Sequence, residues 1–576
     1  MPHLALPWLT SLLRQNGHNV TQRDLNIEVF DTILTARHLR KSIQRIQRRF
    51  GANSKQRASR LFQSALPALD QVQLALERGP ALIEKVEKAK NVLRSQQFYD
   101  GEASLPAFLT CVEALELDSL AHYPAHLDFA GFSDALRPDI SQDLFKSARS
   151  PDINPFYEIF KNGVIQDLKR NPPDLVGISM PTQGQFLAGI TLASLIRESG
   201  LKCHITAGGP HISMLREQIP NVPALFDLFD SFVVFDGEVP LLNLVKALSN
   251  QGDLSNVPNL IYRQPSSQEI RVNPTLPNGD VRQLQLEITP DFDGLPLERY
   301  LAPDLVLPLI TAHGCYFGKC AFCNVGYGEA FNYFPFPVDR LIHQMQQMHE
   351  KYGCRHIFFV DEAITPRTLR LLSEALDENN PIHWGGAVRF EKVLSDDLLE
   401  KLPASGCRMM LFGLESASEP IMDRMIKGIQ LKEMSRILHT STTAGIWNHT
   451  FFFFGFPGET IEDAQETVNF IYAHQDVIQS ASPGAFLMEI YSPAYYFPEK
   501  FGVRKFFKDP QRDLAIYFDY ELETGMDEET ATMLADRLVE QLPGKKYGQY
   551  YISDVYKFLL SSELHRRGQP LPRWIE

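Results

Sequence analysis

The chain has 576 residues, of which 44% are hydrophobic and 22% charged, a size and composition typical of two to four globular domains. Its net charge of −14 argues against a broad basic surface, so no nucleic-acid partner is expected. Seven cysteines are too few for a disulfide scaffold and suit a reducing cytoplasm. No charged-then-apolar leader opens the chain, and its longest aromatic run, residues 451–454, is too short to cross a bilayer. We therefore expect a cytoplasmic protein with no membrane span.

The first 150 residues are predicted to be mainly helical. An amphipathic helix ending near Gly17 is indicated by apolar side chains at Leu4, Leu6, Trp8, Leu9, Leu12 and Leu13. A short strand is predicted at residues 28–30, and residues 32–150 are predicted to form a helical insertion. The basic stretch at 41–50 could bind an anion, although a solvated helix face is the other interpretation.

Residues 172–265 alternate between apolar strands and helices, which is typical of a doubly wound parallel sheet. The predicted strands are 174–180, 203–207 and 231–235, with a helix at 185–199. Ligands of such sheets bind beyond the carboxyl ends of the strands. The loops at 181–183, 208–211 and 236–238 follow those ends and are candidate binding loops.

Three cysteines, Cys315, Cys320 and Cys323, lie within one short loop. Three thiolates this close can hold one soft metal centre and leave a fourth position open, as in an iron–sulfur cluster that binds a small molecule. The main alternative is zinc, which prefers four closed ligands. His313 could supply a nitrogen, but no second Cys-x-x-Cys pair is present. A cysteine cluster without metal is the third interpretation.

From residue 305 to 495 a strand–helix pattern repeats six times. The predicted strands are 307–312, 356–360, 384–389, 408–412, 446–454 and 486–490. In a barrel of parallel strands the chemistry lies on loops at the carboxyl ends of the strands, and the cysteine loop follows the first strand. Pro403 falls inside a helical pattern and is predicted to end or kink that helix.

The run Cys320-Ala-Phe322-Cys323 resembles the radical S-adenosylmethionine superfamily, whose usual signature is Cys-x3-Cys-x-aromatic-Cys. Here the first gap has four residues, which is similar to some cobalamin-associated members. The resemblance implies a partial six-unit barrel, a 4Fe–4S cluster ligated by Cys315, Cys320 and Cys323, and S-adenosylmethionine on the open iron.

The resemblance also suggests which side chains bind S-adenosylmethionine. Phe322 would lie against adenine, Asp361 or Glu362 would bind the ammonium group, and Arg389 would pair with the carboxylate. Glu415 and Ser416 would contact the ribose or methionine end, and the turn with Gly455 and Pro457 would lie near adenine. Alternatively, Arg389 forms an internal ion pair and Glu459-Thr460 caps a helix.

The three loops of residues 172–265 together resemble the cobalamin-binding domain that precedes many radical S-adenosylmethionine cores. The residues expected to contact cobalamin are Ser179, Thr182, Gln183, Gly208, Gly209, Pro210, His211, Gly237 and Glu238. No Asp-x-His-x-x-Gly run offers a lower cobalt ligand, as is common in this family. The first strand of that domain and its loop are not recognised, so either the start was assigned late or the domain is degenerate.

The predicted fold class is α/β. Residues 1–31 and 151–275 form a Rossmann-like cobalamin-binding domain, interrupted by the helical insertion at 32–150. Residues 295–495 form a partial (β/α)6 barrel of the TIM type, and 496–576 an α-rich C-terminal cap.

The resemblance implies an enzyme that generates a 5′-deoxyadenosyl radical and transfers a methyl group from cobalamin to an unactivated carbon. Its expected partners are a small-molecule or peptide substrate and an electron donor such as a flavodoxin or ferredoxin. One alternative is radical rearrangement or cyclisation without methyl transfer. Another is a non-catalytic cluster or cobalamin sensor.

Overall fold

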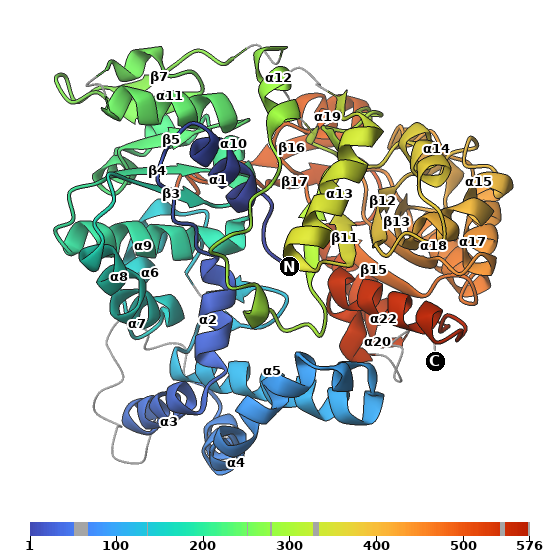
Figure 1. Ribbon diagram of the computed structural model, residues 1–576, viewed down its shortest axis with the longest axis horizontal. Coiled ribbons are helices and arrows are strands. Elements are labelled where there is room, and N and C mark those ends of the chain that lie inside the picture. The colour runs from blue at the N-terminus through green and yellow to red at the C-terminus, as the bar shows by residue number, and fades with distance from the viewer. Residues whose placement is uncertain are drawn as a thin grey trace. The chain divides into compact units, whose positions relative to one another are not determined.

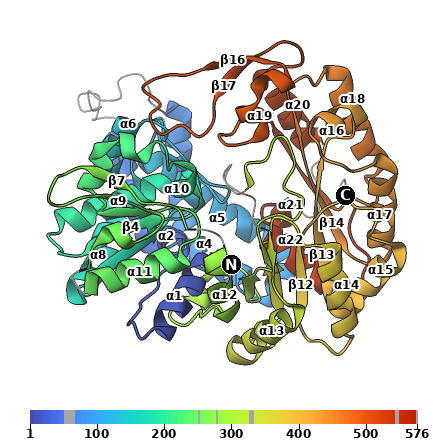
Figure 2. The same ribbon diagram turned by 90° about the horizontal axis from the view of Figure 1, so that it is seen from above.

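The computed structural model describes residues 1–50, 67–134, 136–249, 252–276, 279–325, 333–541 and 548–573. The chain divides into two compact units (Figures 1 and 2). The N-terminal unit comprises His3–Leu301 and Asp509–Ile516. The barrel unit comprises Met1–Pro2, Ala302–Lys508 and Tyr517–Glu576.

The N-terminal unit is rich in helices. Its described helices are α1 (Ala5–Gln15), α2 (Leu25–Ile33), α3 (Ala36–Phe50), α4 (Leu69–Leu93), α5 (Gly101–Ala121), α6 (Ser141–Ala148), α7 (Pro155–Asn162), α8 (Val164–Arg170), α9 (Phe186–Glu198), α10 (Pro210–Met214), α11 (Glu238–Ser249) and α12 (Gly279–Glu287). Its described strands are β1 (His126–Leu127), β2 (Phe132–Ser133), β3 (Leu175–Ser179), β4 (His204–Gly208), β5 (Ser231–Val233), β6 (Leu260–Arg263) and β7 (Ile270–Val272).

The main sheet of this unit has the order β3-β4-β5-β6-β7. Strands β3, β4 and β5 are parallel, which confirms the three predicted strands. Strand β6 is antiparallel to β5, and β7 is antiparallel to β6; neither was predicted, so the sheet is mixed. A parallel pair needs a long crossover, whereas β6 and β7 are joined by a short turn and form a hairpin.

The first predicted strand is wrong, because residues 28–30 lie inside helix α2. The Asp24 side chain caps this helix by accepting hydrogen bonds from the backbone N–H groups of Asn26 and Ile27, at 3.0 and 3.4 Å. Helix α1 confirms the amphipathic helix predicted before it, and Gly17 follows with a φ of +82°.

The barrel unit contains the cysteine loop. Its described strands are β8 (Val306–Leu309), β9 (Ala312–His313), β10 (Phe334–Pro335), β11 (His356–Phe359), β12 (His383–Val388), β13 (Cys407–Glu415), β14 (Trp447–Phe454), β15 (Ser480–Ala485), β16 (Val503–Phe507) and β17 (Asp519–Leu522). Its described helices are α13 (Val338–Tyr352), α14 (Pro366–Ala375), α15 (Asp396–Lys401), α16 (Glu419–Arg424), α17 (Leu431–Thr443), α18 (Ile461–Ala473), α19 (Pro493–Tyr496), α20 (Glu528–Gln541), α21 (Gly548–Tyr551) and α22 (Asp554–Arg566).

Six strands of this unit form one sheet in the order β15-β14-β13-β12-β11-β8, and every neighbouring pair is parallel. The predicted six-stranded parallel sheet is therefore confirmed. The sixth strand, however, is β15, and the prediction at 486–490 is wrong. Strand β15 contains Pro483 and Gly484, which conceal a strand in the sequence. They are tolerated because β15 is an edge strand paired only with β14.

Helices cover the two faces of this sheet differently. Figure 2 shows α14, α15, α17 and α18 in an arc on one side of the strands, with α21 and α22 on the other. On α22, the Phe558 ring packs 5.7 Å from Phe358, and the Ser561 hydroxyl donates to the Arg408 carbonyl at 2.7 Å. Helix α22 therefore fills the inner side of the sheet.

Two smaller predictions concern helices. Helix α15 ends at Lys401 and continues as a 3-10 turn over Leu402–Ser405, as Pro403 predicted. None of the described helices combines the length and apolar character that a bilayer crossing requires.

Candidate functional site

The cysteine loop follows β9 at the carboxyl edge of the six-stranded sheet. Cys315, Cys320 and Cys323 are half-buried free thiols. Burial is the largest cause that raises the pKa of Cys323 to about 12, and the nearby charges of Cys320 and Cys315 raise it further. The fold therefore brings the three sulfur atoms into one neighbourhood.

The described side chains were also compared with the arrangement that a single metal ion requires. Within the described ranges, no group of three or more His, Cys, Asp or Glu side chains is arranged to hold a metal ion. A cubane cluster binds each cysteine at a different corner and so holds its ligands farther apart than one zinc ion does. The absence of such a group among the described residues therefore concerns a site for a single ion, which is what the zinc alternative requires.

Arg389, at the end of β12, holds the cysteine loop from one side. Its Nη1 lies 3.6 Å from the Sγ atom of Cys320, and its Nη2 donates to the Lys427 carbonyl at 2.6 Å. The guanidinium carbon lies 3.6 Å from the centre of the Phe317 ring. This buried cation is thus shared between a cysteine, a backbone carbonyl and an aromatic face.

The widened gap between the first two cysteines is anchored by the same group. Tyr316 donates its hydroxyl hydrogen to Glu391 Oε1 at 2.7 Å, and Arg389 Nε lies 3.3 Å from that oxygen. Because Phe317 stacks on Arg389, both aromatic residues of the gap have fixed partners. The extra residue is therefore accommodated by contacts to the end of β12.

An ion pair lies at the carboxyl end of the next strand, β13. The ammonium group of Lys427 lies 2.7 Å from Glu415 Oε1 and 5.6 Å from the centre of the Phe322 ring. Gly413 leaves room for the pair, since a Cβ there would lie 2.3 Å from Glu415 Oε1. Phe322 also packs edge-on against Phe453 of β14, at 5.2 Å.

Asp361 and Glu362, predicted together, occupy different environments. Asp361 is buried and accepts hydrogen bonds from the Thr311 N–H, the Thr311 hydroxyl and the Ala312 N–H, at 2.7 to 2.9 Å. Burial raises the pKa of Asp361 to about 7, although these hydrogen bonds oppose the shift. Glu362 is exposed. Asp361 therefore braces the backbone that enters the cysteine loop, while Glu362 remains accessible.

Two further predicted residues also have internal partners. Ser416 is fully buried, and its hydroxyl lies 3.3 Å from that of Thr467 and accepts from the Ser418 N–H at 3.1 Å. The Pro457 carbonyl accepts from Arg424 Nε at 3.1 Å.

The turn after β14 is built around a buried carboxylate. Glu459 Oε2 accepts from the Gly455 N–H at 2.5 Å and from the Phe456 N–H at 3.2 Å. Gly455 has a φ of +86°, a conformation that favours glycine. Thr460 caps α18 in a capping box with Asp463, so the helix-cap interpretation holds for Thr460, whereas Glu459 supports the turn.

We expect Glu459→Gln to remove the part of the pH dependence of the unfolding free energy that comes from titration of Glu459. Burial raises the pKa of Glu459 from its ordinary value of 4.5 to about 7, so the folded state binds an extra proton between these values. Its stabilising effect is complete below pH 4.5 and is lost as the pH rises through 7. At pH 8 the variant should be more stable than the parent by about 3 kcal/mol, the free energy that corresponds to this shift.

Urea denaturation of both proteins from pH 4.5 to 8 measures this difference. The exposed neighbour Glu462→Gln serves as the control and should follow the parent at every pH. A constant difference between Glu459→Gln and the parent across this range would contradict the expectation.

In the N-terminal unit the predicted cobalamin residues lie at the carboxyl edge of β3, β4 and β5. Ser179 pairs in register with Gly208, and the next residue, Met180, donates its N–H to the Gly208 carbonyl at 2.8 Å. Gly209 has a φ of +109°, and a Cβ there would lie 3.0 Å from the Met180 carbonyl. Thr182 and Gln183 follow on the loop after β3, and Pro210 begins α10.

His211 and Glu238 of these loops are both buried. The His211 ring packs edge-on against Phe186 at 4.9 Å, and burial lowers its pKa to about 4, so the imidazole is neutral. Glu238 accepts from Trp8 Nε1 at 2.9 Å and from Gln285 Nε2 at 3.2 Å. Gly237 precedes it, with Leu9 of α1 close by.

Several residues of the barrel site were not predicted. Lys427 meets Arg389 and Glu415 only through the fold and carries no local signal. Glu391, two positions after Arg389, is a polar residue beyond a strand end and could have been found that way. Glu489 lies near Glu362, whose charge helps burial to raise the pKa of Glu489 to about 7.

Comparison with known families identifies the part of the chain that contains the cysteine loop. Residues 309–471 match the family model of the Radical SAM superfamily. The chain carries a radical SAM domain. This domain contains the cysteine loop and four of the six strands of the parallel sheet, β11 to β14, together with the end of β8.

Two relatives are named methyltransferases. An uncharacterized methyltransferase of Pyrococcus horikoshii is 28% identical over 337 residues, covering 56% of this chain and 70% of the relative. The bacteriochlorophyllide d C-12(1)-methyltransferase of Chlorobaculum tepidum is 25% identical over 173 residues, covering 29% of this chain and 37% of the relative.

A solved structure resembles more than the radical SAM domain. It is the cobalamin-dependent S-adenosylmethionine radical enzyme OxsB with aqua-cobalamin and S-adenosylmethionine bound. The sequence identity is 16% and the TM-score 0.51, over 72% of this chain and 70% of that structure. The likeness shows a shared fold.

Proposed function

We propose that this chain is a cobalamin-dependent radical S-adenosylmethionine methyltransferase acting on an unactivated carbon of a small molecule or peptide. The observation that carries the proposal is the cysteine loop at the carboxyl edge of six parallel strands, within a radical SAM domain. The names of the two relatives and the ligands of OxsB support the methyl transfer.

The residues around the loop fit a 4Fe–4S cluster. Three thiolates are soft ligands for iron and leave one iron open to the amino group and carboxylate of S-adenosylmethionine. The positive charges of Lys427 and Arg389 favour the thiolate of Cys320 and oppose the burial that raises its pKa. When bound, the reduced cluster supplies one electron that divides S-adenosylmethionine into methionine and a 5′-deoxyadenosyl radical able to abstract hydrogen.

The carboxyl edge of β3 and β4 fits a large polar cofactor such as cobalamin. The Ser179 hydroxyl, Gln185 Oε1 and both ring nitrogens of His211 are buried without a hydrogen-bond partner among the described residues. Buried polar atoms normally have partners, so these atoms indicate a polar ligand. Gly209 lets the backbone approach closely at the same place. Cobalamin bound there would supply the methyl group.

The chain's own side chains would position the reactants. Arg389 holds Cys320 and the widened gap, and Asp361 holds the backbone that leads into the loop. We assign the ammonium group of S-adenosylmethionine to Glu362, which is exposed and near enough to Cys323 to raise its pKa. The predicted pairing of Arg389 with the carboxylate would require one of its present contacts to open.

The remaining parts of the proposal follow from this chemistry. A one-electron donor such as a flavodoxin or ferredoxin must reduce the cluster. Free thiols and an oxygen-sensitive cluster favour the cytoplasm.

Anaerobic reconstitution tests the proposal. The full chain is loaded with iron, sulfide and hydroxocobalamin, desalted, and its visible spectrum recorded. It is then incubated with dithionite and S-adenosylmethionine, and 5′-deoxyadenosine is quantified. Retention of equimolar cobalamin together with 5′-deoxyadenosine formation is expected. 5′-Deoxyadenosine without cobalamin would favour radical rearrangement, and cofactor retention without 5′-deoxyadenosine would favour a sensor.

A further inference from the structure

A basic groove crosses the helical part of the N-terminal unit, away from the sheet loops discussed above. Its volume is about 810 Å³, within the range of small-molecule sites, and α2, α3, α7 and the start of α8 line it. The cationic side chains that line it are Arg23, Arg37, Lys41, Arg45, Arg48 and Arg49. Among the described residues, only three carboxylates line it, those of Glu28, Asp152 and Glu158, although the whole chain has a net charge of −14.

One face of α3 supplies most of this charge. Arg37, Lys41, Arg45 and Arg48 recur every three or four residues, which places them on one side of the helix. Arg37, Lys41 and Arg48 are exposed and form no hydrogen bond or ion pair with any residue in the described ranges. Among the described residues, this row of three cations has no counter-ion.

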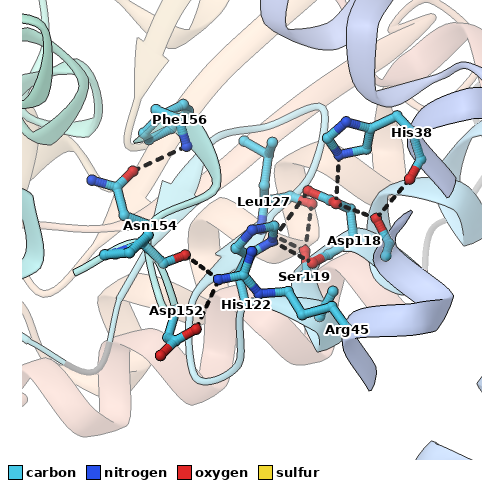
Figure 3. Close-up of polar contacts among 12 residues, drawn as sticks. His38, Arg45, Asp118, Ser119, His122, Leu127, Asp152, Asn154 and Phe156 are labelled. Atoms are coloured by element: carbon cyan, nitrogen blue, oxygen red, sulfur yellow. Dashed lines mark hydrogen bonds and ion pairs between the residues drawn. The ribbon is translucent and has the colours of Figure 1, made fainter. Parts of the chain in front are cut away.

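A half-buried arginine adds charge to the wall of the groove. Arg49 donates to the backbone carbonyls of Ala121, Tyr123 and Asp152, each at 2.8 Å, and all three acceptors are neutral. Burial lowers its pKa to about 10; the charge of Asp152 opposes this shift, and the charge of Arg45 adds to it. Arg45 contacts Asp152 at 3.0 Å and the Pro151 carbonyl, while its Nε is buried without a partner in the described chain (Figure 3).

The groove is also built on a rigid polar base. Figure 3 shows Asp118 between His38 and His122, with contacts of 2.8 Å to His38 Nε2 and 3.5 Å to His122 Nδ1. The Ser42 hydroxyl donates to the same carboxylate at 2.7 Å. Asp118 is fully buried, and both histidines line the groove. This arrangement fixes α3, the helix that carries the cationic row, against α5.

We propose that this groove binds a small polyanion whose phosphate or carboxylate groups are spaced along α3. From Arg37 to Arg48 the helix advances about 16 Å, which is longer than a single phosphate and suits a ligand with several anionic groups. Guanidinium groups present paired donors to such oxygens. The basic stretch in the sequence is therefore a binding surface, and this site is additional to the proposed methyl transfer.

Calorimetric titration of the full chain with inorganic tripolyphosphate and, separately, with citrate tests the inference. The test variant is Arg37→Ala, Lys41→Ala and Arg48→Ala together; these side chains have no described partner, so its fold should persist. The matched control is Arg40→Ala, Lys88→Ala and Lys169→Ala, which removes the same charge from exposed positions outside the groove. Thermal unfolding of each variant checks its stability.

We expect saturable binding of at least one probe, weakened by roughly 10-fold or more in the groove variant and by less than about 2-fold in the control, as for loss of several charge-assisted contacts. Stronger binding of tripolyphosphate would identify a phosphate ligand, and stronger binding of citrate a carboxylate ligand. No binding of either probe, or an equal loss in both variants, would overturn the inference. Neither result depends on cluster or cobalamin loading.

Discussion

Replacement of Cys315, Cys320 or Cys323 by serine is expected to abolish cluster retention and 5′-deoxyadenosine formation. The three thiols lie in one loop and would act as one ligand set, so a single replacement should have nearly the effect of all three. For groups that act as a unit such losses are of the order of 10³-fold or more. Iron and sulfide content, the visible spectrum and 5′-deoxyadenosine are measured after anaerobic reconstitution.

The control for this experiment is Cys354→Ser. Cys354 is fully buried, and its thiol donates to the His356 carbonyl at 3.1 Å, a bond that a serine hydroxyl can replace. This variant should keep its iron, its spectrum and its activity. If it loses the cluster as well, or if a loop variant retains it, the assignment of the ligands is wrong.

Asp361→Asn is expected to destabilise the barrel unit by about 2–4 kcal/mol, because the new amide cannot accept all the hydrogen bonds that the carboxylate accepts. Those donors are the Thr311 N–H and hydroxyl and the Ala312 N–H, just before the cysteine loop. We therefore also expect lower iron content after reconstitution. Urea denaturation of the apoprotein measures the loss of stability.

Glu362→Gln is the informative comparison, since it removes the adjacent charge from an exposed position. It should leave unfolding unchanged and raise the KM for S-adenosylmethionine. The opposite pattern, with normal stability and a raised KM in Asp361→Asn, would make Asp361 the ammonium ligand and contradict the bracing role.

The elements that the sequence predicted well are those with local signals. Hydrophobic runs located β3, β4 and β5 and, in the barrel unit, β8 and β11 to β14, and cysteine spacing located the loop that follows β9. The sixth strand was misplaced because an edge strand needs little apolar pattern, and β15 contains proline and glycine. Residues 28–30 were misassigned because the capping contacts of Asp24 outweigh a short β-like run.

The candidate site was harder to predict, because its contacts join distant segments. Arg389 meets Lys427 and Phe317, and Glu415 meets Lys427, only after β12 and β13 align. Ser416 and Asp361 lie at strand ends, where ligand-binding residues are expected, yet their side chains form hydrogen bonds with other groups of the protein. Position at a strand end is a local signal, whereas the partner of a side chain is a property of the whole fold.

Helix α22 has a consequence for how the protein forms during synthesis. Its Phe558 and Ser561 pack against the inner side of strands whose residues leave the ribosome long before it does. The side of β11 to β13 that α22 covers therefore remains exposed while more than a hundred further residues are translated, since β13 ends at Glu415 and α22 begins at Asp554. Nascent chains in that interval are expected to bind chaperones, and expression at low temperature should improve the yield of folded protein.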